Sequence, residues 1–428
     1  MKTPPNAERR FAKGQRLSHS ESHVGSTDRR PGVRAGALGT IVHIVPDDKF
    51  IDVAFRDFET VAPGCNRFVI IGKTRPLRYV KVTPVEFLAL PEAKALLHSD
   101  ACAAICYHSL GDGLGLLDDL PAGKKALWLG WGYDYYRRLL SGAYPSGLLL
   151  PITNALLKTK PKPKPKSRVR ALGALGLSLA RRLLGISVRF DPKLLAKFSH
   201  FSPVIEWEYQ MARELNPWFK PEYIPWNYGN VEDDMLAGPE VAGVSGENIL
   251  IGNSAAVENN HAEVFDMLEA SAELGDRKII VPLSYGDEWY RGKIIDIGRK
   301  KLGDRFVPLT DFLPKEEYIP LLHSCGHVFM NHLRQQALGT ICIMMLQGSR
   351  IYLHPRNPLY GWFSSRGAAI SSIQELADDP IEVGRRLRPL AEEQRQANID
   401  VVKKHLGREV QREKTRRLVE TLLSRAPA

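Results

Sequence analysis

A polar run at residues 331–340 contains the side chains best suited to bind a charged ligand. It lies between a predicted strand and an apolar run at 341–346, so it marks a loop-to-helix junction. Backbone N–H groups and the positive end of a helix favour an anion there, such as a diphosphate. Arg334 is the first candidate to bind it, with the backbone of Gly339 and Thr340 beside it, because a guanidinium can bond two phosphate oxygens. The alternative is a helix cap followed by a buried helix.

Turns after other predicted strands of the same half contain further polar residues. A turn formed by Gly252, Asn253 and Ser254 would let the backbone approach a phosphate, because glycine has no Cβ. Gln335 and Gln336 either read the nucleotide or its ribose, or form a polar pair at a helix start. Open parallel sheets bind ligands outside the carboxyl ends of their strands, so the site is expected at these turns.

Three titratable residues of the first half are candidates for proton transfer. Asp134 follows a tryptophan-rich run, where its carboxylate either acts as a base or binds an acceptor hydroxyl, or simply caps a helix. His43 and His108 each end an apolar run, so they are either catalytic or buried and hydrogen-bonded. The tyrosines at 133, 135 and 136 either stack on sugar rings or pack in the core.

The cysteines and histidines give no sign of a metal or a disulfide framework. The five cysteines form no CxxC pair, and the histidines lack HxxxH or HxH spacing. We therefore predict no metal and no other cofactor, and a reducing compartment.

Short β-branched runs alternate with helical patterns along both halves of the chain. This alternation predicts βαβ units and mostly parallel sheets. The predicted strands are residues 39–46, 67–72, 103–108, 125–132, 248–251, 278–282, 306–309, 326–330 and 350–353. Since 428 residues exceed the size of a single core, we expect two doubly wound α/β domains that face one another, at residues 38–227 and 228–380.

The remaining segments are strongly charged, and the net charge is +11, so an acidic partner is plausible. Residues 1–37 predict a disordered basic tail, and residues 158–170 a basic Lys-Pro loop. The helix expected at 171–184 has leucines at helical spacing, which either anchor the chain on anionic lipids or pack in the core. Residues 381–428 predict charged helices. No stretch approaches the roughly 20 apolar residues needed to span a bilayer, so any contact with a membrane would be at its surface.

A resemblance adds to this interpretation. The chain resembles the bacterial 4-acetamido-4,6-dideoxygalactose (Fuc4NAc) transferases of enterobacterial common antigen synthesis, glycosyltransferase family 56. In the second half the resemblance rests on residues 249–254, His261, Glu263, Val281, Pro282, Tyr285, Arg334, Gln335, Gln336, Gly339, Thr340, Asn357 and Pro358. In the first half it rests on Trp128, Trp131, Gly132, Asp134 and Tyr136, with weaker echoes at His43 and His108.

The resemblance implies a GT-B glycosyltransferase. The C-terminal domain would bind a dTDP-sugar donor, and the N-terminal domain a lipid-linked oligosaccharide acceptor. It also implies that His261, Tyr285 and Asn357 bind substrate, and that the protein is peripheral on the cytoplasmic face of the bacterial inner membrane. The basic tail, the Lys-Pro loop and the charged C-terminus depart from the family pattern.

Two alternatives stay open. One is a GT-B transferase that uses a UDP- or GDP-sugar for lipopolysaccharide or capsule. The other is a nucleic-acid-binding protein, which the charge suggests; the sequence shows no RRM, KH, zinc-finger or helix-turn-helix pattern, so we predict no nucleic-acid partner.

Overall fold

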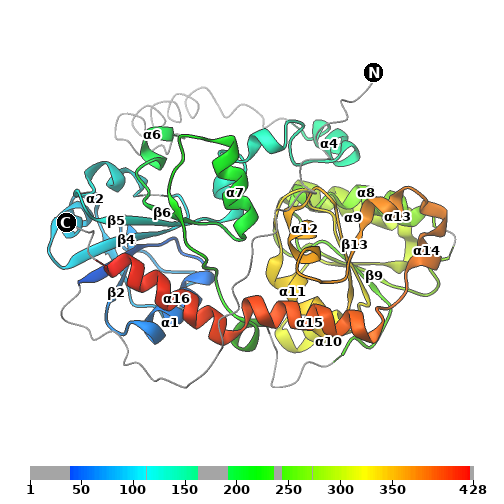
Figure 1. The fold of residues 1–428 in the computed structure, drawn as a ribbon. Coiled ribbons are helices and arrows are strands. Elements are labelled where there is room, and N and C mark those ends of the chain that lie inside the picture. Colours follow the sequence, from blue (N-terminus) through cyan, green and yellow to red (C-terminus); the bar gives the residue numbers. More distant parts are fainter. Residues whose placement is uncertain (1–38, 112, 162–190, 236–242, 272, 425–428) are drawn as a thin grey trace. The chain divides into compact units, whose positions relative to one another are not determined.

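The computed structural model describes residues 39–111, 113–161, 191–235, 243–271 and 273–424. The predicted basic tail, most of the Lys-Pro loop and the predicted helix at 171–184 lie outside these residues. Within them, the chain forms two parallel sheets (Figure 1).

The first sheet has the strand order β3-β2-β1-β4-β5-β6-β7. Its neighbours pair in parallel throughout, so the order reverses direction between β1 and β4, which is the switch point of a doubly wound sheet. The strands are β1 (Thr40–Ile44), β2 (Asn66–Ile71), β3 (Val85–Leu88), β4 (Cys102–His108), β5 (Lys125–Leu129), β6 (His200–Ser202) and β7 (Glu222–Tyr223).

The second sheet repeats this topology with the order β10-β9-β8-β11-β12-β13. Its switch point lies between β8 and β11, which pair in parallel. The strands are β8 (Ile249–Ile251), β9 (Ile279–Pro282), β10 (Phe306–Leu309), β11 (His327–Met330), β12 (Arg350–Leu353) and β13 (Ile370–Ser372). Both sheets are the doubly wound α/β type that the sequence predicts.

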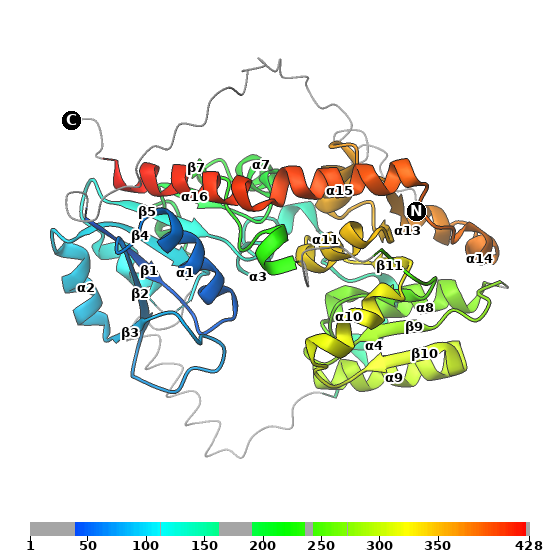
Figure 2. The ribbon, with the colours of Figure 1, turned by 90° about the horizontal axis from the view of Figure 1, so that it is seen from below.

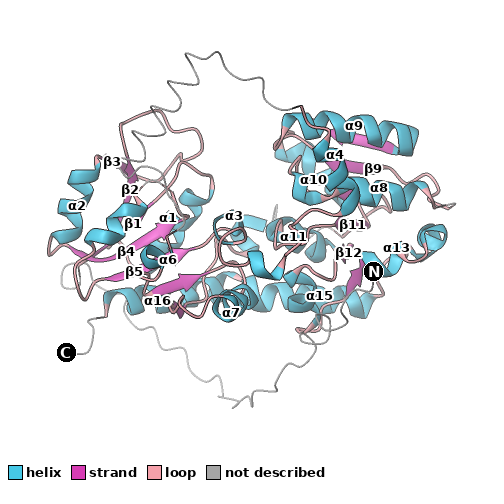
Figure 3. Ribbon diagram, turned by 90° about the horizontal axis from the view of Figure 1, so that it is seen from above, coloured by secondary structure: helices cyan, strands magenta, loops and turns pink. Residues whose placement is uncertain are grey.

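Helices connect the strands, as parallel pairing requires. Figure 3 shows α8 and α9 beside strand β9 of the second sheet. In the first half the helices are α1 (Phe50–Val61), α2 (Leu90–His98), α3 (Gly132–Tyr135), α4 (Pro151–Lys158), α6 (Pro192–Leu195) and α7 (Glu206–Leu215). The later helices are α8 (His261–Glu269), α9 (Glu288–Leu302), α10 (Lys315–His323), α11 (Leu338–Gln347), α12 (Pro358–Ser364), α13 (Ile373–Ala377), α14 (Val383–Arg386), α15 (Glu392–Leu406) and α16 (Arg408–Leu423).

Single turns complete the described chain. The 3-10 turns are η1 (Leu114–Asp119), η2 (Ser141–Ala143), η4 (Val257–Asn259), η5 (Gly303–Arg305) and η6 (Pro380–Glu382), and η3 (Val231–Met235) is a π-turn. None of the helices in the described ranges is long and apolar enough to cross a membrane.

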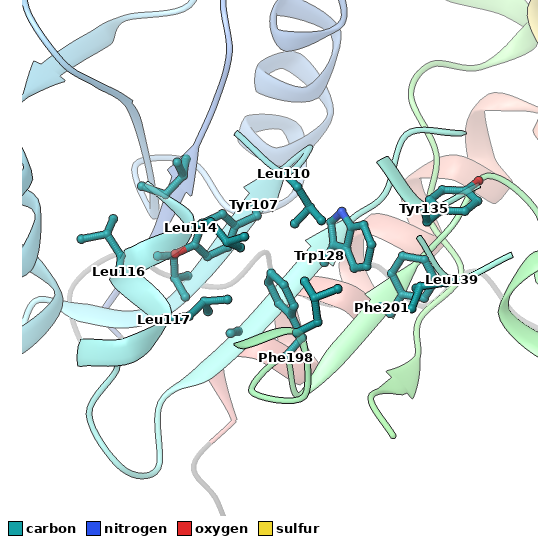
Figure 4. Packing of buried hydrophobic residues seen from close by; sticks show 14 of the residues in the cluster. Tyr107, Leu110, Leu114, Leu116, Leu117, Trp128, Tyr135, Leu139, Phe198 and Phe201 are labelled. Atoms are coloured by element: carbon teal, nitrogen blue, oxygen red, sulfur yellow. The ribbon is translucent and has the colours of Figure 1, made fainter. Parts of the chain in front are cut away.

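Aromatic side chains form much of the core on one face of the first sheet. Trp128 on β5 is fully buried and packs against Phe198 and Phe201 with ring centroids 5.6 and 4.5 Å apart. Figure 4 shows Tyr107 and Tyr135 in the same layer. The layer therefore fixes the position of α3, whose Tyr135 is part of it.

The charged C-terminal segment packs against both halves. Helix α15 contacts α11, and α16 contacts α1 (Figure 2). The inward residues of α16, among them Thr415, Leu418, Val419 and Leu422, recur at three- and four-residue spacing, which gives one buried face. Thr415 also accepts a hydrogen bond of 3.0 Å from Nε1 of Trp226.

Candidate functional site

The turn after β8 lies at the switch point of the second sheet. Gly252 has φ of +67°, a conformation that residues with a Cβ rarely adopt. An added Cβ would lie 2.5 Å from Oδ1 of Asn259 and 2.7 Å from Nε2 of His261. Glycine is therefore required here for both conformation and space.

Asn259 connects this turn to the loop after β11. Its Oδ1 accepts hydrogen bonds from the backbone N–H of Asn253 and from Nε2 of His332, both at 2.9 Å. Asn259 and His332 are fully buried. The turn after β8 and the loop after β11 thus share one hydrogen-bond acceptor.

Buried histidine nitrogens face this turn without a protein partner. In the described chain, Nε2 of His261 and Nδ1 of His332 accept or donate no hydrogen bond. Burial lowers the pKa of His261 to about 3, and burial together with the charge of Arg334 lowers that of His332. Both rings are therefore neutral in the free protein.

Predicted substrate-binding residues meet above the same turn. The side-chain amide of Asn253 donates to the hydroxyl of Tyr285, and its oxygen accepts from Nε2 of Gln336, both at 3.1 Å. Ser254 lies in the turn and accepts from the amide of Asn259 at 3.3 Å. The structure therefore brings together residues from the ends of β8, β9 and β11.

Helix α11 begins beside these residues and presents an open N-terminus. Its first turn follows Ala337, which has φ of +59°, and no side chain caps it. Such a conformation is strained for a residue other than glycine and recurs at functional sites. An added Cβ at Gly339 would meet nothing within 4 Å, so the space in front of this turn is open. The exposed N–H groups and the helix dipole favour an anion there.

Arg334 lies just before this helix end. It is half-buried, and its Nη1 donates to the backbone oxygen of Gln335 at 3.0 Å. Within the described ranges it forms no ion pair with a carboxylate. Arg334 therefore supplies a positive charge that no salt bridge of the described residues neutralises, three residues before the uncapped helix end.

The loop after β11 also contacts α3 of the first half. The backbone N–H of Gln335 donates to the hydroxyl of Tyr136 at 2.8 Å, and both residues are buried. At Gly132, an added Cβ would lie 3.1 Å from Nη1 of Arg334. The candidate donor-binding loop and the predicted acceptor-binding loop are therefore in direct contact.

Glu208 on α7 lies beneath this contact. It is fully buried and accepts a bond of 2.7 Å from the hydroxyl of Tyr135, while its Oε1 has no partner among the described residues. Burial raises its pKa to about 7, against the opposing effects of the tyrosine hydroxyls and of Arg334. Its charge state therefore changes near neutral pH.

Asp134 caps α3, which was the alternative the sequence left open. Its Oδ2 accepts from the backbone N–H of Trp131 at 3.1 Å, and its Oδ1 accepts from the hydroxyl of Ser109 at 3.0 Å. Ser109 has φ of +82° and also bonds the hydroxyl of Tyr133, whose side chain is 58% exposed. Burial raises the pKa of Asp134 to about 6, against these hydrogen bonds. A base of that pKa accepts a proton near neutral pH.

His43 and His108 form a buried pair at the switch point of the first sheet. Because the amide nitrogen of Asn66 donates elsewhere, its oxygen accepts from Nε2 of His43 at 3.2 Å. Nδ1 of His43 then accepts from Nε2 of His108 at 2.9 Å, and Nδ1 of His108 accepts from the hydroxyl of Tyr228 at 2.8 Å. Both rings are inaccessible, so they reach a substrate only through Tyr228. Their catalytic role stays a prediction.

Cys106 lies beside this pair. Its Sγ is 3.7 Å from Nε2 of His108, and these three residues could hold a metal ion by their spacing. The hydrogen bonds of the pair satisfy all four ring nitrogens with both rings neutral, since burial lowers the pKa of His43 to about 3 and that of His108 further. The nucleotide-binding experiment proposed below therefore includes EDTA, which tests the prediction that the protein needs no metal.

The other predicted residues lie at strand ends of the second sheet. Asn357, after β12, caps α12 through the backbone N–H of Leu359 at 3.0 Å, and its Nδ2 has no partner in the described part of the chain. Thr340 is half-buried in the first turn of α11. Their roles in binding stay predictions.

Comparison with known proteins identifies this half of the chain. Residues 234–387 match a family model described as 4-alpha-L-fucosyltransferase, glycosyl transferase group 56. This region is similar to the group 56 glycosyltransferases. The resemblance stated from the sequence is thereby confirmed over these residues, and it supports a glycosyltransferase activity.

Solved structures confirm the GT-B fold predicted for this glycosyltransferase. The N-terminal domain of Candida albicans trehalose-6-phosphate phosphatase superimposes with a TM-score of 0.59 at 10% identity, covering 92% of this chain and 98% of that one. Trehalose-6-phosphate synthase OtsA gives 0.54 at 12% identity, covering 91% and 100%. Anabaena HepE, solved with UDP and glucose, gives 0.54 at 12% identity, covering 90% and 99%. These likenesses concern the fold alone.

Several residues of the glycosyltransferase site were not predicted from the sequence. Asn259 and His332 lie two positions before the predicted residues His261 and Arg334. Their own role is visible only in the structure, where they contact each other across 73 positions of sequence. Ser109 follows His108, and Glu208 lies in a stretch rich in aromatic residues. The Ser-Leu-Gly turn directly after the predicted strand at 103–108 is the signal that could have singled out Ser109.

We predict that Gly252→Ala lowers both stability and nucleotide affinity of the glycosyltransferase. The new Cβ would displace Asn259 and His261, so the midpoint of thermal unfolding should fall and nucleotide-induced stabilisation should disappear. Gly367→Ala is the matched control, because Gly367 has φ of +87° with nothing within 4 Å of an added Cβ. Equal losses in the two variants would attribute the effect to φ alone and contradict the contact.

We also predict that Glu208 makes stability fall with rising pH. Its folded pKa of about 7 exceeds the ordinary value of 4.5, so the native state binds the proton more tightly than the unfolded state. The stability that protonated Glu208 contributes is complete below pH 4.5 and is lost as the pH rises to about 7. Denaturant unfolding from pH 5 to 8 should show a steeper decline for the wild type than for Glu208→Gln. Parallel curves would refute the assignment, and Glu206→Gln, at a half-exposed carboxylate on the same helix, is the control.

Proposed function

We propose that this glycosyltransferase moves an amino-dideoxy sugar of the Fuc4NAc type from a dTDP-sugar to a polyprenyl-diphosphate-linked saccharide in cell-surface polysaccharide synthesis. It would act as a peripheral protein on the cytoplasmic face of the bacterial inner membrane. The match over residues 234–387 supports the family, and the sequence resemblance supports this donor and acceptor. A UDP- or GDP-sugar is the second candidate donor, since HepE was solved with UDP.

The observation that carries the proposal is the unpaired Arg334 before the uncapped end of α11. A nucleotide-sugar leaves as a diphosphate, whose negative charge grows as the bond to the sugar breaks. Fixed donors placed where that charge develops lower the barrier most. Arg334 and the N–H groups of the first turn of α11 would provide them without a metal.

The proposed reaction forms one bond and breaks another. An acceptor hydroxyl oxygen bonds to the anomeric carbon, while the bond from that carbon to the diphosphate oxygen breaks. The hydroxyl proton must pass to a base, and we assign this role to Asp134. Because Asp134 is buried, the proton would reach it through the hydroxyls of Tyr133 and Ser109, which are 2.9 Å apart.

Nucleotide binding tests the donor. With EDTA present, dTDP should raise the unfolding temperature more than UDP, GDP or CDP, because a ligand that binds only the native state stabilises it. Arg334→Ala should weaken dTDP binding by about 10- to 100-fold, as expected for lost hydrogen bonds to a charged group. Arg299→Ala, an exposed arginine on α9, is the control. Stabilisation by UDP or GDP instead would select the second donor, and unchanged affinity in Arg334→Ala would overturn the diphosphate assignment.

Turnover tests the base. Asp134→Asn keeps an oxygen that can accept from Trp131 N–H, so the fold and dTDP binding should persist. Transfer to a lipid-linked acceptor should fall about 10²- to 10⁴-fold. Asp100→Asn, at an exposed carboxylate, is the control. Full turnover in Asp134→Asn would leave this residue with capping as its role.

A further inference from the structure

The connection from β2 to β3 is unusually basic. Residues 72–84 contain Lys73, Arg75, Arg78 and Lys81, and no acidic residue. All four side chains are exposed. Among the described residues, none of them forms an ion pair with a carboxylate. This segment therefore presents four positive charges outside any salt bridge of the described residues, although Arg75 interacts electrostatically with Asp47.

Two aspartates fix the backbone of this segment. Asp47 accepts from the N–H groups of residues 78, 79 and 80 at 2.7 to 3.1 Å. Asp52 accepts from those of residues 81, 82 and 83 at 2.8 to 3.2 Å, and from the Thr83 hydroxyl at 2.6 Å. Burial alone would raise the pKa of both carboxyls. The hydrogen bonds outweigh burial, so the pKa of each carboxyl lies below its usual value. The segment is thus held in one conformation.

This conformation turns apolar side chains outward between the cations. Val80 and Thr83 are buried and anchor the segment, while Tyr79 is 45% exposed and Val82 is 70% exposed. The guanidinium of Arg78 lies 5.0 Å from the ring centroid of Tyr79. The hydrogen bonds to Asp52 place this connection beside the first turn of α1.

The start of α1 extends this surface toward the predicted acceptor loop. Phe50 is 41% exposed, and the ammonium of Lys49 lies 5.3 Å from its ring centroid. The Phe50 ring is 5.9 Å from that of Trp131, which in turn is 5.7 Å from Tyr133. Cationic and apolar groups, with the carboxylate of Asp48 among them, therefore continue up to the loop that contains Asp134.

We propose that residues 72–84, together with Lys49 and Phe50, dock on the anionic lipid surface of a bilayer. We call this set the β2–β3 surface. Unpaired cations attract acidic headgroups, and exposed apolar side chains between them can enter the headgroup region. This inference rests on the proposed function, in which the acceptor is linked to a lipid. Docking of the β2–β3 surface would bring the Trp131–Tyr133 loop to the membrane surface, where that acceptor lies.

Vesicle flotation of the full chain tests the proposal. Wild type should float with vesicles of phosphatidylglycerol and phosphatidylethanolamine, and much less with phosphatidylcholine vesicles or at high salt. Arg78→Ser/Lys81→Ser should weaken binding to the acidic vesicles by about 10- to 30-fold, because each lost cation reduces binding by about fivefold. Tyr79→Ser/Val82→Ser should weaken it about tenfold with no change in charge.

The matched control is Lys293→Ser/Lys300→Ser, which removes two exposed cations from α9. Flotation of this control should equal that of the wild type. The proposal would be overturned if the variant Lys73→Ser/Arg75→Ser/Arg78→Ser/Lys81→Ser floated as well as the wild type. It would also be overturned if the α9 control lost as much flotation as Arg78→Ser/Lys81→Ser. The dTDP-induced thermal shift is measured on every variant, so a folding defect or a failed donor assignment is distinguished from a failed docking surface.

Discussion

The side-chain oxygen of Asn259 connects the two loops on which the donor site depends. It accepts from Asn253 in the turn after β8 and from His332 in the loop after β11. Because an unpaired buried donor costs free energy, both loops are fixed relative to the strands that precede them. Gly252 leaves the space for this contact, and Gln336 and Tyr285 then bond Asn253 from opposite sides. Together with the bond from Gln336 to Asn253, this acceptor aligns Arg334 and α11 with the turn after β8.

A second buried contact relates this site to the first sheet. The bond from Gln335 N–H to the Tyr136 hydroxyl joins the donor loop to α3, and α3 is capped by Asp134. Glu208 lies beneath the same tyrosine pair, so the charge there depends on pH. Under the proposed function, this contact couples binding of the leaving group, placement of the base and packing between the halves.

The sequence predicts the repeated βαβ plan because the central strands are continuous runs of β-branched residues. Residues 103–108 and 326–330 match β4 and β11 to within one residue. It does not predict β3, a run of only four half-buried residues, nor β6, α7 and β7, which lie in an aromatic stretch without clear periodicity. In the site, glycine turns and Arg334 follow from local patterns. Asn259, His332 and Glu208 do not, since their roles depend on partners more than 70 positions away.

The packing of α16 on α1 has a consequence for biosynthesis. Leu418, Val419 and Leu422 share one apolar cluster with Phe58 and Phe68, so the last helix completes a core that the first strands begin. About 200 residues separate the end of β7 from the end of α16. At roughly 5–20 residues per second, the ribosome needs on the order of 10–40 s to add them. During that interval the nascent N-terminal half exposes the apolar face that α16 later covers, which makes it a natural client for a chaperone at the ribosomal exit.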